Sequence, residues 1–185
     1  MNAMVLLSGG IDSTSCIHFL QSQKYDVSSV FVNYGHHANS MEKSRALDIA
    51  DYFDISHSVI DISSNAKFLS SEIQGRNAFL IFSALMLSGL TQGVIAIGIH
   101  SGTDYYDCSE LFYNRIQKVV HEYSNGRISL IAPFIKWSKQ NIIEYLDENN
   151  LPLQSTYSCE IGNTLPCGKC KSCKDREAYC VCSSA

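Results

Sequence analysis

The sequence has few prolines, few glycines and no long apolar run, and each shortage excludes a class of protein. Three prolines and 11 glycines in 185 residues are too few for a disordered or fibrous chain. The most apolar stretch, residues 79–90, is too short to cross a bilayer. The first seven residues are uncharged and run directly into a glycine turn, unlike a signal peptide. We therefore expect a globular cytoplasmic protein without a membrane partner.

Basic residues are also scarce. The chain has 14 Lys and Arg against 18 Asp and Glu, which gives a formal net charge of −4. Proteins that bind nucleic acids usually carry a basic excess or a basic stripe, and neither is present here. Nucleic acid is therefore not expected as the main partner. The 45% share of hydrophobic residues is enough to bury the core of one domain.

Short apolar runs alternate with segments of helical periodicity along residues 1–150. This alternation predicts an α/β fold with a doubly wound parallel sheet, in which ligands bind at the carboxyl ends of the strands. Ser40 is expected to cap the second helix, and the almost wholly apolar fourteen-residue helix 77–90 is expected in the core or at a homodimer interface. The expected strands are 4–7, 27–33, 57–62, 94–99 and 129–132, and the expected helices are 13–23, 40–53, 77–90, 109–123 and 139–149.

The apolar periodicity stops at residue 151, where cysteine, glycine and lysine become frequent. We therefore expect a nucleotide-binding domain over residues 1–150 and a cysteine-rich metal-binding segment over 151–185, which is too small to fold without metal. Six of the eight cysteines lie between residues 159 and 182. A secreted disulfide scaffold would spread its cysteines, so this clustering indicates metal binding. Cys108 stands alone and is expected to be a buried, inert thiol.

The turn after the first strand, residues 8–13, carries the first chemical signal. Gly9 and Gly10 allow the backbone to approach a ligand and to point N–H groups at an anion, and the following helix adds its partial positive charge. Ser8 and Ser13 offer hydroxyl donors, and Asp12 is suited to hold Mg²⁺. The Gly-Lys-Ser/Thr of ordinary P-loops and the GxGxxG of dinucleotide sites are both missing. A tight turn with a Ser/Asp helix cap is the plainer alternative.

The sequence Ser-Gly-Gly-x-Asp-Ser of this turn is similar to the signature of the PP-loop ATP pyrophosphatases. It is followed by Gly-Arg-Asn at 75–77, by two acidic loop positions, by Ala-Pro-Phe at 132–134 and by the cysteine cluster. This order resembles the QueC family, the 7-cyano-7-deazaguanine synthases of queuosine biosynthesis, over nearly the whole chain. The resemblance implies an ATP-dependent carbon–nitrogen ligase that activates the carboxylate of 7-carboxy-7-deazaguanine as an adenylate and releases AMP and pyrophosphate. Ammonia then gives an amide, which a second ATP converts to the nitrile.

The resemblance also implies roles for single residues. Arg76 would neutralise the α-phosphate or the substrate carboxylate, Lys139 would stabilise the departing pyrophosphate, and Asp104 would hold Mg²⁺ or bind the guanine-like N–H edge. For these residues, ordinary surface roles such as solvation or helix capping stay open. The implied ATP-binding residues are Ser8, Gly9, Gly10, Asp12 and Ser13; the catalytic residues are Asp12, Arg76, Asp104 and Lys139; and the substrate-binding residues are Arg76, Asn77, Asp104 and Asp107.

Cys159, Cys167, Cys170 and Cys173 have the spacing C-x7-C-x2-C-x2-C. A tight turn with this spacing aims several thiolates at one point, as tetrahedral Zn²⁺ requires, and the sequence around it matches the zinc site of the resembled family. An iron–sulfur cluster is the alternative. We favour Zn²⁺ because all four cysteines lie close together and no motif for a redox partner is present. Cys180 and Cys182 have no assigned role.

Three departures from the family pattern lie on the expected rim of the site. The family's Tyr-Gly-Gln is replaced by residues 34–37, Tyr-Gly-His-His; an insertion before Gly75 is missing; and the loop 104–107 is short. An opened rim suggests a larger amine acceptor, such as a protein N-terminus, in place of ammonia. Two further hypotheses are a tRNA sulfur-transferase of the PP-loop group, which the acidic balance disfavours, and a non-catalytic partner protein that binds nucleotide and zinc.

Overall fold

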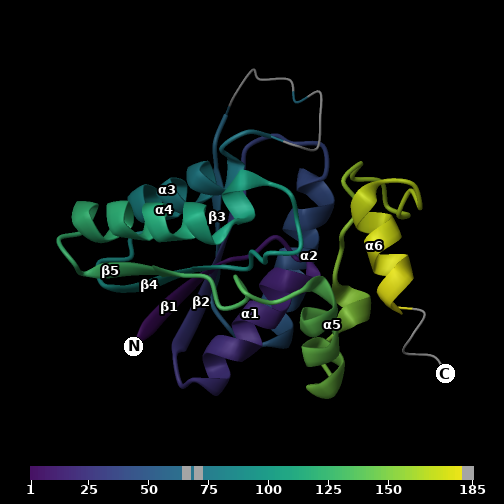
Figure 1. Ribbon diagram of the computed structural model, residues 1–185, viewed down its shortest axis with the longest axis horizontal. Coiled ribbons are helices and arrows are strands. Elements are labelled where there is room, and N and C mark those ends of the chain that lie inside the picture. Colours follow the sequence, from purple (N-terminus) through teal and green to yellow (C-terminus); the bar gives the residue numbers. More distant parts are fainter. Residues whose placement is uncertain (64–67, 69–72, 181–185) are drawn as a thin grey trace.

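The computed structural model describes residues 1–63, 68 and 73–180, so Cys182 and most of the span before Gly75 lie outside the described residues. Its centre is a five-stranded, all-parallel sheet with the strand order β3-β2-β1-β4-β5 (Figure 1). This confirms the predicted parallel sheet. The strands are β1 (Asn2–Leu6), β2 (Asp26–Asn33), β3 (His57–Asp61), β4 (Gly93–Ile97) and β5 (Ile128–Ile131).

Helices cover both faces of the sheet (Figure 1). One face packs against α1 (Ile11–Ser22), α2 (Asn39–Tyr52) and α5 (Lys139–Glu148), and the other against α3 (Arg76–Leu87) and α4 (Glu110–Tyr123). All ten predicted strands and helices are present, with ends shifted by at most three residues. Two short 3₁₀ helices, η1 (Tyr106–Cys108) and η2 (Leu153–Ser155), lie in the connections. The doubly wound architecture is therefore confirmed.

The first strand shows why these residues form a two-faced sheet. Ala3, Val5 and Leu7 belong to the core under α1, α2 and α5, whereas Met4 and Leu6 belong to the core under α3 and α4. Successive strand residues point to opposite faces, so a continuous apolar run is what a strand buried on both sides requires. Each fully buried side chain of this kind contributes about 1.5–3 kcal/mol.

The order of the strands reverses between β1 and β4. From β1 the chain moves outward through β2 to β3, and it returns through α3 to β4 on the other side of β1. Leu6 pairs with both Val30 of β2 and Ile97 of β4. The connections that follow β1 and β4 therefore leave toward opposite faces, which opens a crevice at their carboxyl ends.

Two details differ from the sequence-based expectations. Ser40 does not cap α2. The helix begins at Asn39, so Ala38 is the N-cap residue, and it makes no side-chain cap hydrogen bond. Ala38 is buried against Tyr157 and Cys159, so tertiary packing fixes the start of this helix. Helix α3 is buried on its inner side only: Met86 is 74% exposed. The homodimer stays a prediction.

The C-terminal segment contains a helix that the sequence pattern did not predict, α6 (Lys171–Cys180). It lies beside α2 and α5, apart from the main sheet layers (Figure 1). The segment is tied to the domain by the backbone N–H of Tyr157, which donates to the carbonyl oxygen of Gly9 at 2.8 Å. Among the described residues, no helix has the length and apolar character needed to cross a membrane.

Candidate active site and metal centre

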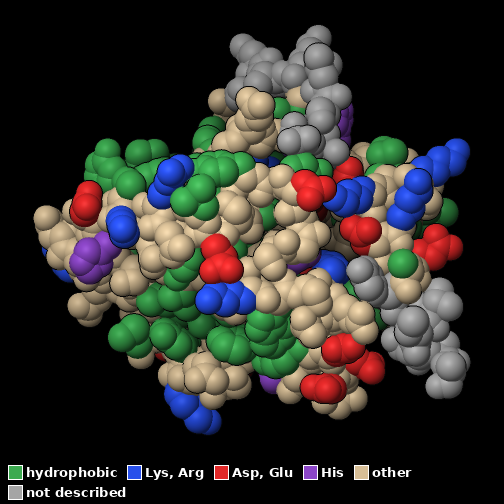
Figure 2. Space-filling view, in the orientation of Figure 1, with side chains coloured by type: hydrophobic (Ala, Val, Ile, Leu, Met, Phe, Trp, Pro, Cys, Tyr) green, Lys and Arg blue, Asp and Glu red, His purple; other side chains and the backbone are tan. Residues whose placement is uncertain are grey.

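A cavity of about 380 Å³ opens at the carboxyl ends of β1, β2 and β4. Its size lies within the range of small-ligand pockets. Figure 2 shows a hollow between the sheet domain and the C-terminal segment, with basic and acidic side chains gathered around it. The cavity wall includes the loop after β1, the start of α3, the loop after β4, the first residue of α5 and the C-terminal segment. The crevice expected from the strand order is therefore the site of this cavity.

The N-terminus of α1 faces this cavity. Gly10 is its N-cap residue and provides no side-chain cap, so the first N–H groups of the helix are directed at the cavity without a side-chain partner from the cap. The hydroxyl groups of Ser13 and Thr14 donate to the carbonyl oxygen of Gly10 at 3.1 and 2.9 Å, which fixes the turn. Such an end attracts anions, and phosphate is the common biological case.

Close backbone approaches hold this turn in place. Gly9 has a φ of +71°, and a Cβ atom there would lie 2.6 Å from the Cβ atom of Arg45 in α2. A Cβ atom on Gly98, at the end of β4, would lie 2.8 Å from the backbone of Asp12. Glycine is therefore required at both positions, because α1 and α2 pack directly on the backbone there.

Asp12 is the centre of a charged group in the cavity. Its Oδ1 atom lies 2.6 Å from Nζ of Lys139, and its Oδ2 atom lies 3.9 Å from Nε2 of His100. The Nδ1 atom of His100 accepts a hydrogen bond from the N–H of Gly102, so the proton of the neutral ring lies on Nε2, toward Asp12. Burial lowers the pKa of His100, although the Asp12 carboxylate opposes this shift.

Arg76 begins α3 and lies in the same cavity. Burial raises the pKa of the Tyr34 hydroxyl to about 12, although the positive charge of Arg76 opposes this shift. Asn77 is buried, and its side chain donates to the carbonyl oxygen of Asp107 at 3.0 Å. In return, the Asp107 carboxylate accepts from the backbone N–H of Asn77 at 3.1 Å. Asp107 therefore fixes the start of α3.

The structure brings most of the implied site residues together but places three of them outside the cavity wall. Asp104 is exposed, and neither it nor Asp107 is among the residues that line the cavity. The backbone of Gly9 lies behind the wall, where it accepts from Tyr157. The implied residues that line the cavity are Ser8, Gly10, Asp12, Ser13, Arg76, Asn77 and Lys139.

Sequence reasoning missed the wall that the C-terminal segment contributes. Lys171, Ser172, Asp175 and Arg176 of α6 all line the cavity. Positions 172, 175 and 176 have the i, i+3, i+4 spacing of one helix face, which is the signal that could have identified them. Glu160 accepts hydrogen bonds from the N–H and hydroxyl of Ser172 at 3.1 and 2.8 Å, which holds the first turn of α6.

Arg176 anchors α6 to the domain. Its guanidinium donates to the carbonyl oxygen of Leu153 at 2.8 Å and to the carbonyl and hydroxyl oxygens of Thr156 at 3.1 and 2.8 Å. The ammonium of Lys171 lies 5.5 Å from the centre of the Tyr105 ring, across the cavity mouth. The C-terminal segment therefore forms part of the cavity wall.

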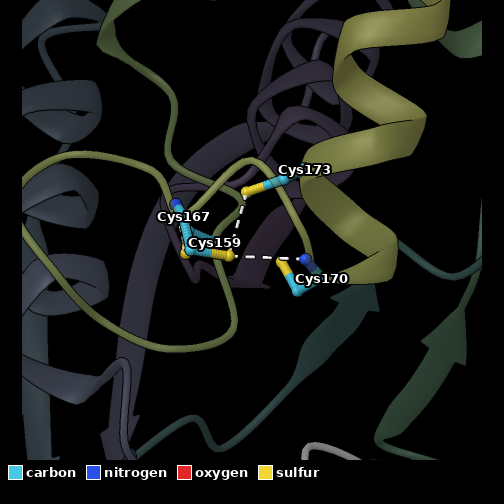
Figure 3. Close-up of side chains that lie close together, drawn as sticks. All are labelled: Cys159, Cys167, Cys170 and Cys173. Atoms are coloured by element: carbon cyan, nitrogen blue, oxygen red, sulfur yellow. Dashed lines mark hydrogen bonds between the residues drawn. The ribbon is translucent and has the colours of Figure 1, made fainter.

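The four clustered cysteines point toward one another (Figure 3). Their sulfur atoms all lie within 4.8 Å of one another, and those of Cys167 and Cys173 are 3.9 Å apart. Four thiolates at the usual zinc–sulfur distance of about 2.3 Å stand roughly 3.8 Å apart in a tetrahedron. A four-iron cluster binds each thiolate to a different iron and so spreads the sulfurs further. The spacing fits a single metal ion.

The surroundings of the thiols also fit a cation. Burial acts to raise the pKa of Cys159, but N–H groups of Cys167 and Ile161 outweigh it and lower this pKa to about 6. Burial and the neighbouring thiols raise the pKa of Cys173 to about 12. Without a cation, the cluster therefore contains one easily ionised thiol, Cys159, beside one that resists ionisation, Cys173. A bound metal ion would stabilise all four as thiolates.

Comparison with known proteins identifies relatives over nearly the whole chain. A family model described as "Queuosine biosynthesis protein QueC" matches residues 2–74 and 63–180. The 7-cyano-7-deazaguanine synthase of Prochlorococcus marinus subsp. pastoris is 28% identical over 206 positions, covering 95% of this chain and 92% of that protein. The 7-cyano-7-deazaguanine synthase of Rhizobium leguminosarum bv. trifolii is 28% identical over 207 positions, covering 97% of this chain and 87% of that protein.

The alignments indicate that this chain lacks residues that the relative has. The aligned span of 206 positions is longer than this 185-residue chain, so the relative carries insertions that the chain lacks. The two parts of the family match overlap at residues 63–74, in the span where an insertion is expected to be missing. This part of the chain lies mostly outside the described residues.

Solved structures support the fold. An NMN synthetase from Francisella tularensis matches with a TM-score of 0.52 and 16% identity, covering 90% of this chain and 70% of that one. The U34-tRNA thiolase NcsA from Methanococcus maripaludis, solved with its [4Fe-4S] cluster, matches with a TM-score of 0.55 and 12% identity, covering 98% and 65%. At such identities the likeness shows a shared PP-loop-type α/β fold and no more.

Proposed function

The chain belongs to the QueC family, and on that premise we propose that it is an ATP-dependent ligase. It would adenylate the carboxylate of 7-carboxy-7-deazaguanine and transfer the acyl group to a nitrogen nucleophile, with release of AMP and pyrophosphate. One observation carries the proposal: the phosphate-binding end of α1 and the cation of Arg76 face one cavity of about 380 Å³. A nucleotide and a carboxylate can meet in such a space.

The ATP end of the cavity is built from residues 8–13. The N–H groups at the start of α1 and the hydroxyls of Ser8 and Ser13 would bind the β- and γ-phosphates. Lys139 would neutralise the charge that develops on pyrophosphate as it leaves. Asp12 would hold Mg²⁺, which supplies charge neutralisation on the phosphates when bound.

The acyl end is built from the start of α3. Arg76 would bind the substrate carboxylate or the α-phosphate through its planar guanidinium. Asn77 would contact the heterocycle, with Asp107 holding it in position through their two hydrogen bonds. Asp104, exposed at the rim, would contact the heterocycle or a metal ion only when substrate brings its loop closer.

The reaction then consists of two displacements. A carboxylate oxygen attacks the α-phosphorus, and the bond to the bridging oxygen of pyrophosphate breaks. Nitrogen next attacks the acyl carbon, AMP leaves with the former carboxylate oxygen, and the nitrogen loses a proton to give a neutral amide. With ammonia as nucleophile, a second ATP would activate the amide oxygen, and its loss would give 7-cyano-7-deazaguanine.

We also propose that the four cysteines hold one Zn²⁺. Tetrahedral thiolate coordination without an open position is typical of structural zinc, and the sulfur spacing fits it. The proposed domain boundary near residue 150 then separates the sheet domain from a segment whose fold depends on this ion. The ion supplies folding free energy and takes no part in the reaction.

Mass spectrometry of reaction products tests the function. The protein is incubated with ATP, Mg²⁺ and 7-carboxy-7-deazaguanine, with and without ammonium, and reactions without the carboxylate serve as the control. We expect AMP and pyrophosphate in equal amounts only when the carboxylate is present, and the amide or nitrile only with ammonium. Formation of ADP would contradict the proposal.

The same assay separates the other hypotheses. Adenylate formation without an ammonia product, together with a stable amide when a peptide amine is added, would indicate a macromolecular acceptor. No pyrophosphate with any carboxylate, despite nucleotide binding, would indicate a non-catalytic partner protein.

A further inference from the structure

Three side chains on one wall of the cavity form a connected set that the proposed reaction has not used. The Nε2 atom of His36 lies 2.9 Å from Oε2 of Glu42 in α2. The imidazole of His36 is stacked on the ring of Tyr34, with the ring centres 4.3 Å apart and the planes inclined by 20°. All three residues line the cavity.

The contact with Glu42 determines which imidazole nitrogen is an acceptor. An ionised carboxylate only accepts hydrogen bonds, so Nε2 of His36 carries the hydrogen of this bond. In the neutral ring, Nδ1 is then left with a lone pair. This Nδ1 atom is buried and has no hydrogen-bond partner among the described residues. Buried acceptors are rarely left without a donor, so either an ordered water or a bound ligand supplies one here.

The position of this acceptor is well fixed. The His36 side chain is only 11% exposed. Glu42 contacts the edge of its imidazole at Nε2, and the ring of Tyr34 stacks on its face. The ring of Tyr34 is in turn held by T-shaped contacts with the rings of Phe68 and Phe79, whose centres lie 5.5 and 5.8 Å from its own. Nδ1 therefore presents one lone pair in a set direction, which is the requirement for selective recognition.

The neighbouring lining suits a flat ring. Apolar side chains of Val32, Leu80 and Ile97 line the same cavity, next to the polar groups already described. A planar heterocycle presents apolar faces and an edge that bears N–H groups, which matches apolar walls with a single buried acceptor.

We propose that Nδ1 of His36 accepts a hydrogen bond from the N–H edge of a planar heterocycle bound in the cavity, and that Glu42 and Tyr34 position it. The naming of the heterocycle rests on the proposed function: both the adenine of ATP and 7-carboxy-7-deazaguanine carry an exocyclic amino group. His36 is then a specificity-determining residue for one of these two ligands.

Equilibrium binding of each ligand to three variants tests this, with wild-type protein as reference. His36→Phe keeps an aromatic ring on Tyr34 and removes both nitrogens. His36→Asn places an amide oxygen close to the position of Nδ1, because both atoms are bonded to Cγ. His37→Phe is the matched control, since His37 is the exposed next residue and does not line the cavity.

We expect His36→Phe to weaken binding of one ligand by about ten- to a hundredfold, His36→Asn to restore much of it, and His37→Phe to change nothing. A ligand analogue without the amino group, purine riboside triphosphate or 7-carboxy-7-deazahypoxanthine, should bind wild type and His36→Phe equally. The ligand whose binding weakens, ATP or 7-carboxy-7-deazaguanine, is the one that His36 contacts. Unchanged binding of both ligands, or a loss that His36→Asn does not restore, would overturn the inference.

Glu42 is tested through the same ligand. Glu42→Ala should weaken its binding, and Glu42→Gln should restore it, because the amide oxygen of glutamine still accepts from Nε2. Equal binding to both variants would remove Glu42 from the inference. If wild-type protein binds ATP but not 7-carboxy-7-deazaguanine, the proposed function fails. The ATP measurements then still decide whether His36 hydrogen-bonds a heterocycle.

Discussion

The ammonium group of Lys139 lies 2.6 Å from the carboxylate of Asp12, at the point where the first residue of α5 meets the first turn of α1. Both side chains are mostly shielded from water, at 20% and 26% exposure. A pair in such surroundings is stronger than one at the open surface. The two residues are far apart in sequence and together define one end of the cavity.

Replacement of Lys139 should slow pyrophosphate formation. Under the proposed function, Lys139→Ala removes the cation that would stabilise the leaving pyrophosphate, so we expect kcat to fall by about 10²–10³-fold. Initial rates of pyrophosphate release measure this. The matched control is Lys136→Ala, because Lys136 is largely exposed and lies outside the cavity wall. Among the described residues its one ion pair is with Glu110, at 3.7 Å. A similar loss in both variants would show that general charge is responsible.

Gly98→Ala should destabilise the fold and displace the first turn of α1. The added methyl group would lie 2.8 Å from the backbone of Asp12, and we expect a loss of about 1–3 kcal/mol. Gly10→Ala meets nothing closer than 3.4 Å and should cost less than about 1 kcal/mol. Chemical denaturation compares the two. Equal losses would mean that the close approach between β4 and α1 is not what restricts position 98.

Removal of metal should unfold the C-terminal segment and leave the sheet intact. A chelator removes the ion that gathers the four thiolates, so α6 should become sensitive to protease within residues 151–180 while the sheet resists. Elemental analysis should find one zinc per chain in wild type and none in Cys173→Ser. Cys16→Ala, which changes a core cysteine outside the cluster, should retain the metal. Visible absorption typical of iron–sulfur clusters would contradict the zinc assignment.

Stability should fall in mildly acidic solution, in part through His57. Burial lowers the pKa of His57 below 6.5, although Asp51 opposes the shift. The unfolded chain then binds the proton more readily, so this contribution is complete above pH 6.5 and is lost as the pH falls through the lower, folded value. Between about pH 7.5 and about pH 5, the melting temperature of His57→Gln should therefore fall less steeply than that of wild type. His121→Gln, at an exposed position of α4, should decline like wild type.

The strands and the glycine-rich turn after β1 could be predicted because their signals are local. The alternation of Ala3, Val5 and Leu7 with Met4 and Leu6 fills both faces of one strand, and a continuous apolar run expresses this directly. The glycine-rich turn of residues 8–13 likewise follows at once from the end of β1. Neither feature depends on knowing which distant residue lies nearby.

The far wall of the cavity could not be predicted, because its causes are not local. Helix α6 is polar along its length, and its hydrogen bonds to Glu160 and through Arg176 depend on the fold of the preceding loop. Asp104 and Asp107 are close in sequence, yet the first is exposed and the second turns inward to Asn77. Spacing alone does not tell which carboxylate packs against the fold and which stays in water.

The hydrogen bond from Tyr157 to Gly9 has a consequence for the newly made protein. On the ribosome, the turn around residue 9 emerges early, whereas Tyr157 and the cavity wall of α6 emerge much later. A nascent chain therefore carries glycine-rich backbone without the cover that completes its pocket. Nucleotide turnover should begin only once synthesis has passed the cysteine cluster, so half-made chains would not consume ATP.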